Sequence, residues 1–248
     1  ELASTAEKGT HTLGPIIHNP QLVNSLSARG VSPVDSLQDV ADGSKVLIRS
    51  HGVGPHVYEE AEAKHLDVVD ATCPHVKKAQ QDARKVINDK KALIIVGEKD
   101  HPEVISISQW GCNRAIIIDK VEEAKEIPYC EHMGVVVQTT FSQSRFKQIE
   151  SVLAEKTDDL DVYMTICTAT RQRQEAAVEL AKKVDAMIVI GGKNSANTGR
   201  LAQVCAEQGC PTYHVETASE LNVADFRGMS DIGVTAGAST PDWIIQEV

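Results

Sequence analysis

The feature that most constrains the fold is a segment that occurs twice in the chain. Residues 67–74, with the sequence DVVDATCP, resemble residues 161–168, with the sequence DVYMTICT. In both copies an apolar run leads to a cysteine, a helical stretch, a second apolar run and a polar loop. A repeat of this kind predicts equivalent structural modules. One offset of 94 residues pairs three residue types without a gap: Cys73 with Cys167, Gly97 with Gly191 and Lys99 with Lys193.

A third copy is visible in part near the N-terminus. His18 lies four residues after Gly14, as His101 and Ser195 follow their own glycines. The other two cysteines precede their glycines by 24 residues, so the first module's cysteine is expected just before Glu1. Both ends of the chain look cut. We predict three modules: residues 1–72, truncated at the N-terminus; residues 73–166; and residues 167–248, truncated at the C-terminus.

The alternation of apolar and helical segments predicts the fold class. Short runs rich in β-branched residues are typical of buried parallel strands, and segments with helical spacing lie between them. Strand–helix alternation indicates an α/β architecture with parallel sheets. Strands are predicted at 46–48, 92–96, 134–137, 186–190 and 232–234, and helices at 74–88 and 171–184.

Composition excludes several functions. The net charge of −10 leaves no basic field for nucleic acid or an anionic membrane. No apolar run approaches the roughly 18–20 residues that span a bilayer. The chain has no signal-peptide pattern, and its six scattered cysteines do not suggest a disulfide framework, so a cytoplasmic protein is expected.

The repeated cysteines indicate a metal centre. Each lies where a strand gives way to a helix, and the field of a helix N-terminus favours a thiolate. Three such thiolates suggest a 4Fe–4S cluster with one iron that no protein residue binds. Zinc is the rival, but its cysteine ligands usually come in closely spaced pairs. Any one cysteine taken alone would more often be an idle buried thiol.

Polar residues after the strands indicate an anion site. The carboxyl ends of parallel strands are where such sheets bind ligands, and helix N-termini there suit phosphate. A lone histidine is more often structural, but equivalent positions in three modules favour a binding role. The candidates are His18, His51, His101, Ser195, Asn197 and Ser239.

Glu103 is the candidate acid. It lies two residues beyond His101, so it would sit beside a bound anion and away from water. Such a carboxyl should have a raised pKa and carry a proton at neutral pH. The alternative is a surface carboxylate in the first turn of a helix.

Several motifs resemble the 4-hydroxy-3-methylbut-2-enyl diphosphate reductase family. They occur in the family's order from about Leu13 to Val248. The motifs are GPIIHNP (14–20), RSHGV (49–53), DATCP (70–74), HPEV (101–104), QTT (138–140), TIC (165–167), RQ (173–174), GKNSAN (192–197) and TAGASTPD (235–242).

The resemblance implies three α/β modules in a cloverleaf around a central 4Fe–4S cluster held by Cys73 and Cys167. Glu103 would deliver protons, with Thr139 or Thr140 beside it and Thr170 near the cluster. The substrate would be an allylic diphosphate and the electron donor a ferredoxin or flavodoxin. Reductive loss of the hydroxyl as water would give isopentenyl and dimethylallyl diphosphate. The substrate-binding positions would be His18, His51, His101, Thr139, Thr170, Ser195, Ala196, Asn197 and Ser239.

Three features depart from the family pattern. The first cysteine, in a Gly-Phe-Cys motif, is absent; Ala196 replaces a common serine; and Ser106 replaces a common glycine. Two other functions stay open. A quinolinate-synthase-like cluster enzyme would not explain Glu103 together with the histidines. A non-catalytic phosphometabolite-binding protein would have no use for the acid.

Overall fold

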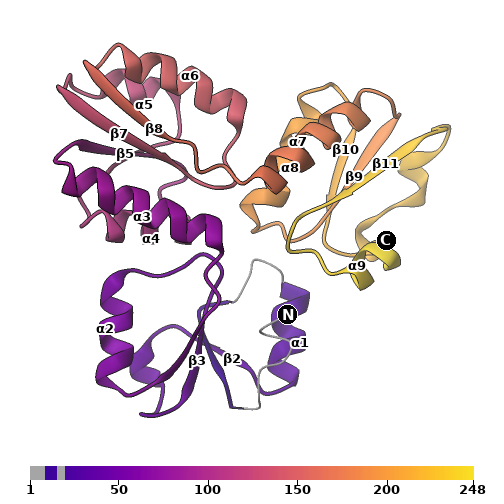
Figure 1. Cartoon of the computed structure of the whole chain (residues 1–248). Coiled ribbons are helices and arrows are strands. Elements are labelled where there is room, and N and C mark those ends of the chain that lie inside the picture. The colour runs from indigo at the N-terminus through magenta and orange to yellow at the C-terminus, as the bar shows by residue number, and fades with distance from the viewer. Residues whose placement is uncertain (1–8, 16–19) are drawn as a thin grey trace. The chain divides into compact units, whose positions relative to one another are not determined.

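The computed structural model describes residues 9–15 and 20–248. The described strands form three parallel sheets, flanked by helices, so the predicted α/β class is confirmed (Figure 1). Sheet A contains β1 (His11–Leu13), β2 (Ser32–Val34), β3 (Lys45–Ile48) and β4 (Asp67–Asp70). Sheet B contains β5 (Ala92–Val96), β6 (Ile116–Ile118), β7 (His132–Val137) and β8 (Asp159–Tyr163). Sheet C contains β9 (Ala186–Ile190), β10 (Thr212–Val215) and β11 (Ile232–Ala236).

The three sheets share one strand order. Sheet A runs β2-β1-β3-β4, sheet B runs β6-β5-β7-β8 and sheet C runs β10-β9-β11. In each sheet the first strand in sequence therefore lies between the second and the third. This common topology is what a repeated βα module produces, because parallel strands need a crossover connection each time. The boundaries at residues 72 and 166 stay a prediction.

The helices occupy the connections between strands. They are α1 (Pro20–Ala28), α2 (Pro55–Ala63), α3 (Pro74–Asn88), α4 (Pro102–Trp110), α5 (Val121–Glu126), α6 (Gln143–Ala154), α7 (Thr168–Ala181), α8 (Ala196–Ala206) and α9 (Asp242–Glu247). Short 3₁₀ helices cover Leu37–Asp39 (η2), Ala218–Glu220 (η3) and Val223–Phe226 (η4).

The two predicted helices are present. The first has the predicted bounds, since Pro74 starts it and Val76, Ala79, Ala83 and Val86 repeat with the spacing of one buried face. The second covers 168–181 instead of 171–184, because the Arg171 N–H already donates to the carbonyl of Cys167. Both helices therefore begin directly after a cysteine.

The described residues divide into two compact units. Unit 1 contains residues 9–15 and 25–166 with sheets A and B, and unit 2 contains residues 20–24 and 167–248 with sheet C. In unit 1, sheet B has two apolar faces. Phe146 and Ile149 of α6 pack on one face, and Ala83 of α3 and Ile107 of α4 pack on the other.

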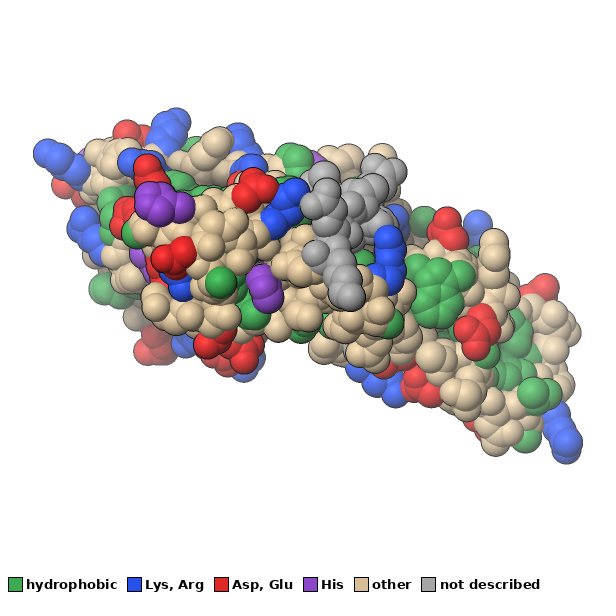
Figure 2. All heavy atoms as spheres, turned by 90° about the horizontal axis from the view of Figure 1, so that it is seen from below, with side chains coloured by type: hydrophobic (Ala, Val, Ile, Leu, Met, Phe, Trp, Pro, Cys, Tyr) green, Lys and Arg blue, Asp and Glu red, His purple; other side chains and the backbone are tan. Residues whose placement is uncertain are grey.

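Charges of both signs are interspersed on the face shown in Figure 2. In the part of the chain that the structure describes, no helix is both long enough and apolar enough to cross a bilayer.

Candidate functional site

Glu103 is held by the start of α4. Pro102 occupies the first turn, where its missing N–H costs nothing. His101 is the N-cap, and its Nδ1 accepts a hydrogen bond of 3.2 Å from the backbone N–H of Glu103. The accepting nitrogen cannot carry a proton, so a neutral His101 ring carries its proton on Nε2. One short segment thus fixes both the histidine and the acid.

The Glu103 carboxyl is buried and bound at both oxygens. Its residue is only 2% exposed. The backbone N–H of Thr139, which follows β7, donates to Oε1 at 2.6 Å, and the Thr139 hydroxyl lies 2.9 Å from Oε2. Thr140 instead accepts from the side-chain amide of Gln138 at 3.2 Å. Of the two predicted threonines, Thr139 is the one that contacts Glu103.

The pKa of Glu103 is raised to about 7. Burial is the largest cause, because the charged form loses its water; the two Thr139 hydrogen bonds oppose it, and the nearby Glu98 carboxylate raises the pKa further. The site therefore holds a carboxyl that is protonated in a large share of molecules at neutral pH. This is the property that a general acid needs.

The raised pKa predicts a pH-dependent stability. The unfolded chain releases this proton near the ordinary pKa of 4.5, whereas the folded protein keeps it until about 7. Stability is therefore lost as pH rises through that window. Relative to Glu103→Gln, the wild-type free energy of unfolding should fall by about 1–3 kcal/mol between about pH 5 and pH 8. Urea titrations at both pH values measure it, and parallel pH profiles would contradict it.

His51 and His101 lie together in unit 1, although the sequence assigned them to different predicted modules. Their ring centroids are 5.4 Å apart in an edge-to-face arrangement. Ser106 of α4 joins the same segments, because its hydroxyl lies 2.9 Å from the carbonyls of both His51 and Glu103. Ser106, a departure from the family pattern, thus ties the two histidine segments together.

Gly52 keeps the His51 loop close to α3. Its φ is +71°, a region that favours glycine, and an added Cβ would lie 2.3 Å from Nε2 of Gln80. That same Gln80 amide lies 3.2 Å from the Ser106 hydroxyl. The loop can therefore approach α3 and α4 only because residue 52 has no side chain.

Unit 2 places the polar loop residues at the carboxyl edge of sheet C. Ser195 is the N-cap of α8, and its hydroxyl accepts from the N–H of Thr198. Ala196 is the first helical residue, and Ser239 lies in the turn after β11. Thr240 joins the two loops, since its hydroxyl donates to the carbonyl of Ile190 at 2.9 Å.

Asn197 is the most informative residue of unit 2. It is 7% exposed, and neither its amide nitrogen nor its amide oxygen has a hydrogen-bond partner in the described part of the chain. A buried amide without partners costs stability, so native proteins retain one where a ligand or water completes it. The position favours an anion or hydroxyl ligand.

Two further buried polar residues were not assigned a role from the sequence. Thr198 is fully buried beneath the glycine loops, since a Cβ on Gly237 would lie 2.1 Å from its hydroxyl. Gln174 lies one turn after the buried Thr170 on α7, and its amide nitrogen lacks a partner among the described residues. The spacing of Thr170 and Gln174, which puts both on one helix face, was the available signal.

Cys73 and Cys167 occupy equivalent positions as the N-caps of α3 and α7. Both are free and half-buried, and neither side chain caps its helix. They belong to different units, and the described residues contain no group of three potential metal ligands. His18 lies outside the described residues. Cys205 and Cys210 belong to the apolar core of unit 2, and Cys112 is exposed.

The two repeated lysines form ion pairs. Lys99 lies 3.9 Å from Glu123, and Lys193 pairs with Glu220. Their equivalence in the repeat therefore reflects a shared ion pair at the end of the polar loop.

Comparison with known proteins agrees with these motifs. The LytB protein family matches residues 1–248. The chain is 47% identical to the 4-hydroxy-3-methylbut-2-enyl diphosphate reductase of Pelobacter propionicus and 48% identical to that of Trichlorobacter lovleyi. Each alignment covers 99% of this chain and 88% of the relative.

Two solved structures are also similar. One is the E-1-hydroxy-2-methyl-but-2-enyl-4-diphosphate reductase of Plasmodium falciparum, at a TM-score of 0.93 and 27% identity, covering 98% of this chain and 78% of that one. The other is an (E)-4-hydroxy-3-methyl-but-2-enyl diphosphate reductase described as the terminal enzyme of the non-mevalonate pathway. Its TM-score is 0.69 at 43% identity, covering 99% of this chain and 88% of that one. Sequence, motif order and fold together lead to one conclusion: the chain belongs to the LytB protein family.

Proposed function

We propose that the protein is an oxidoreductase that removes the hydroxyl group of (E)-4-hydroxy-3-methylbut-2-enyl diphosphate. The observation that carries the proposal is the buried carboxyl of Glu103, whose pKa is raised to about 7, in a chain 47% identical over 246 residues to a reductase of that name. A binding protein has no need of such a group.

The reaction balances with two electrons and two protons. The C–O bond of the allylic alcohol breaks and its oxygen leaves as water with one proton. The other proton and the two electrons form a new C–H bond, which gives isopentenyl or dimethylallyl diphosphate. The protein must therefore supply a proton donor, a diphosphate site and a route for electrons.

Glu103 fits the role of proton donor. The N–H of Thr139 donates to Oε1 and its hydroxyl donates to Oε2, so Thr139 orients the carboxyl. When Glu103 is protonated, Oε2 can carry the proton, and the Thr139 hydroxyl then turns to accept from it. Burial favours the protonated carboxyl, because ionisation without water is costly. The proton is therefore available when a substrate is bound beside Glu103.

We assign phosphate binding separately in each unit. In unit 1 the neutral His101 presents an Nε2–H donor, and His51 lies against it. In unit 2 the candidates are Ser195, Asn197 and Ser239, at the carboxyl edge of sheet C, with Ala196 contributing backbone only. Donors of this kind hold an anion without a basic surface.

Cys73 and Cys167 are the two residues of this chain that we propose as ligands of a metal centre. Each thiol is half-buried at a helix N-terminus and has no hydrogen bond within the described residues. We propose that they bind a 4Fe–4S cluster, which when bound would pass the electrons one at a time. Thr170, on the first turn of α7, lies three residues after Cys167.

We make two further assignments, the electron donor and the location in the cell. We propose a ferredoxin or flavodoxin as electron donor, because each delivers single electrons. We also propose a cytoplasmic location, since all six cysteines are free thiols and a reducing compartment keeps them so.

The Asn197 assignment is testable. Replacing Asn197 by leucine removes the amide but keeps the branching and the number of heavy atoms of the side chain. If the amide serves a ligand, folding stability should stay equal or rise, because a buried unpaired group disappears. The KM for the diphosphate should rise at least about tenfold, the value of one charge-assisted hydrogen bond. Steady-state kinetics and thermal unfolding measure the two effects.

Thr198→Val is the matched control for that experiment. It also removes a buried unpaired hydroxyl, but the residue lies beneath the loops and has no exposed surface. Its KM should match that of the wild type. A marked loss of stability with an unchanged KM in Asn197→Leu would show that the amide is structural.

A further inference from the structure

Helix α3 carries an unusual charge for this protein. The chain has a net charge of −10, yet α3 contains four cations against one carboxylate, a net charge of +3. The one carboxylate, Asp82, is buried and pairs with Lys78. The outward surface of α3 therefore offers only basic and neutral side chains to solvent. The cations are Lys77, Lys78, Arg84 and Lys85.

The cations of α3 fall into two pairs. Lys77 forms an ion pair of 2.7 Å with Asp70, and Lys78 pairs with Asp82. Arg84 and Lys85 are exposed and have no carboxylate partner among the described residues; they lie over the rings of Trp110 and Tyr163, at 5.9 and 5.4 Å. Asp82 is buried and already paired with Lys78, and the next acid along the chain is Asp89, at the C-terminal cap. The second half of α3 thus keeps uncompensated positive charge.

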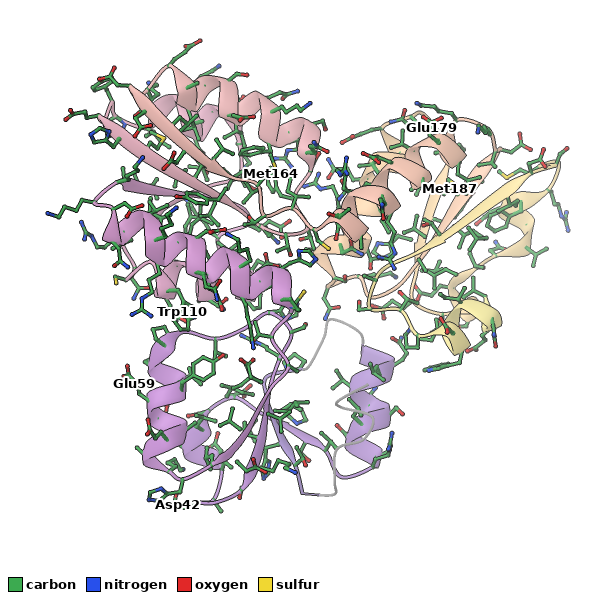
Figure 3. The ribbon with its side chains drawn as sticks, in the orientation of Figure 1. Asp42, Glu59, Trp110, Met164, Glu179 and Met187 are labelled. Atoms are coloured by element: carbon green, nitrogen blue, oxygen red, sulfur yellow. The ribbon has the colours of Figure 1, made fainter. Side chains whose placement is uncertain are left out.

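A hollow accompanies this charge. It has a volume of about 390 Å³ and is lined by residues of β4, α2, α3 and α4 of unit 1. Trp110, which lies in its wall, is labelled in Figure 3. Tyr58 and Trp110 lie in its wall with ring centroids 6.4 Å apart, and Arg84 and Lys77 line its α3 side. Tryptophan, tyrosine and arginine around a hollow are the residues that most often anchor protein partners.

The position of Cys73 places this surface near the proposed metal centre. It is the N-cap of α3, so the basic helix begins at the residue proposed to bind the cluster. At 1.5 Å per residue, Lys77 and Lys78 lie about 6–8 Å along the helix from Cys73, and Arg84 about 16 Å. A partner on this face would therefore sit close to the proposed metal centre.

We propose that the exposed face of α3, with the hollow beside Trp110, is the docking surface for an acidic protein that delivers single electrons. The inference rests on the proposed function, because only a reduction needs such a partner. The partner should be acidic, because a negative surface is attracted to the basic face of α3, whereas the rest of this acidic chain would repel it. A single helix face also suits the small interfaces of transient electron-transfer complexes. It is too small for nucleic acid, which typically engages about 6–10 phosphate contacts.

Charge reversal tests the surface. Arg84→Glu with Lys85→Glu leaves no carboxylate stranded, because neither residue has an ion pair among the described residues. In the full-length enzyme with its cluster, KM for an acidic flavodoxin should rise on the order of tenfold, through slower association. Turnover driven by dithionite-reduced methyl viologen should stay within about twofold, since that reductant needs no docking surface.

The matched control is Lys125→Glu with Lys147→Glu. These exposed lysines lie on α5 and α6, which pack on the opposite face of sheet B. The control changes the net charge equally but should leave the flavodoxin KM near that of the wild type. Added salt should raise KM in the wild type and control, and should raise it far less in the α3 variant.

The other outcomes are equally decisive. An unchanged flavodoxin KM in the α3 variant would overturn the docking surface while the proposed function stands. An equal rise of the flavodoxin KM in the α3 variant and in the Lys125→Glu, Lys147→Glu control would overturn the docking surface as well, while the proposed function stands. A changed oligomeric state with an unchanged KM would assign the face to a second copy of the chain. If viologen drove no turnover even in the wild type, the proposed function would fail and the docking surface with it. Were the α3 variant to fold poorly, the milder Arg84→Ala with Lys85→Ala should still raise KM.

Discussion

Replacing Glu103 by glutamine should lower kcat on the order of 10²-fold or more, while the protein stays folded and keeps the visible absorbance expected of the proposed cluster. Glutamine preserves the shape, and its oxygen can still accept the Thr139 N–H that now meets Oε1 at 2.6 Å. Only the transferable proton is lost. Anaerobic steady-state kinetics and a visible spectrum measure the two parts of the result.

Glu98→Gln is the control for this change. Glu98 is an exposed neighbour whose charge raises the pKa of Glu103 without touching the carboxyl. Its removal should leave kcat within about twofold and shift the pH profile slightly lower. In the wild type, kcat should fall as pH rises through about 7, because the acid loses its proton there. Wild-type turnover in Glu103→Gln would remove the proton-donor assignment.

Replacing Cys73 by serine should abolish turnover, at least on the order of 10³-fold, and bleach the visible absorbance of the enzyme. A hydroxyl is a poor ligand for iron in a sulfur-bound cluster, and within residues 9–15 and 20–248 Cys73 and Cys167 are the cysteines at equivalent helix N-caps. The fold should persist, since the thiol neither caps α3 nor belongs to an apolar core. Iron and sulfide analysis of anaerobically purified protein, with circular dichroism, measures both.

Cys112→Ser is the matched control for the ligand claim. Cys112 is exposed in the turn after α4 and has no equivalent in the repeat. Its iron content and spectrum should equal those of the wild type. A normal spectrum in Cys73→Ser, or bleaching in both variants, would contradict the special role of Cys73.

The central strands were predictable from sequence because a strand buried on both faces consists of consecutive apolar residues, many of them β-branched. The runs at 92–96 and 186–190 are continuous and β-branched, and both are strands with those bounds. The edge strands β2, β6 and β10 were not predicted. They are three or four residues long and only partly buried, and β2 contains a proline, so their pairing depends on a neighbour and not on their own pattern.

The site was predictable in its residue types but not in its contacts. The repeat singled out Glu103, yet its partner Thr139 is 36 residues away, and only the packing of β7 beside β5 brings the two together. The sequence could not choose between Thr139 and Thr140 for the same reason. The unpaired amide of Asn197 is also invisible in sequence, because partners are a property of three-dimensional packing.

The N-cap role of His101 couples two tasks that are usually separate. Since the ring accepts the N–H of Glu103, any ligand that reorients the imidazole also acts on the first turn that positions the acid. With the diphosphate bound at His101 as proposed above, the substrate would contact the residue that caps the helix of the acid. An allylic alcohol without phosphates would lack that contact with His101, and should react poorly even at saturating concentration.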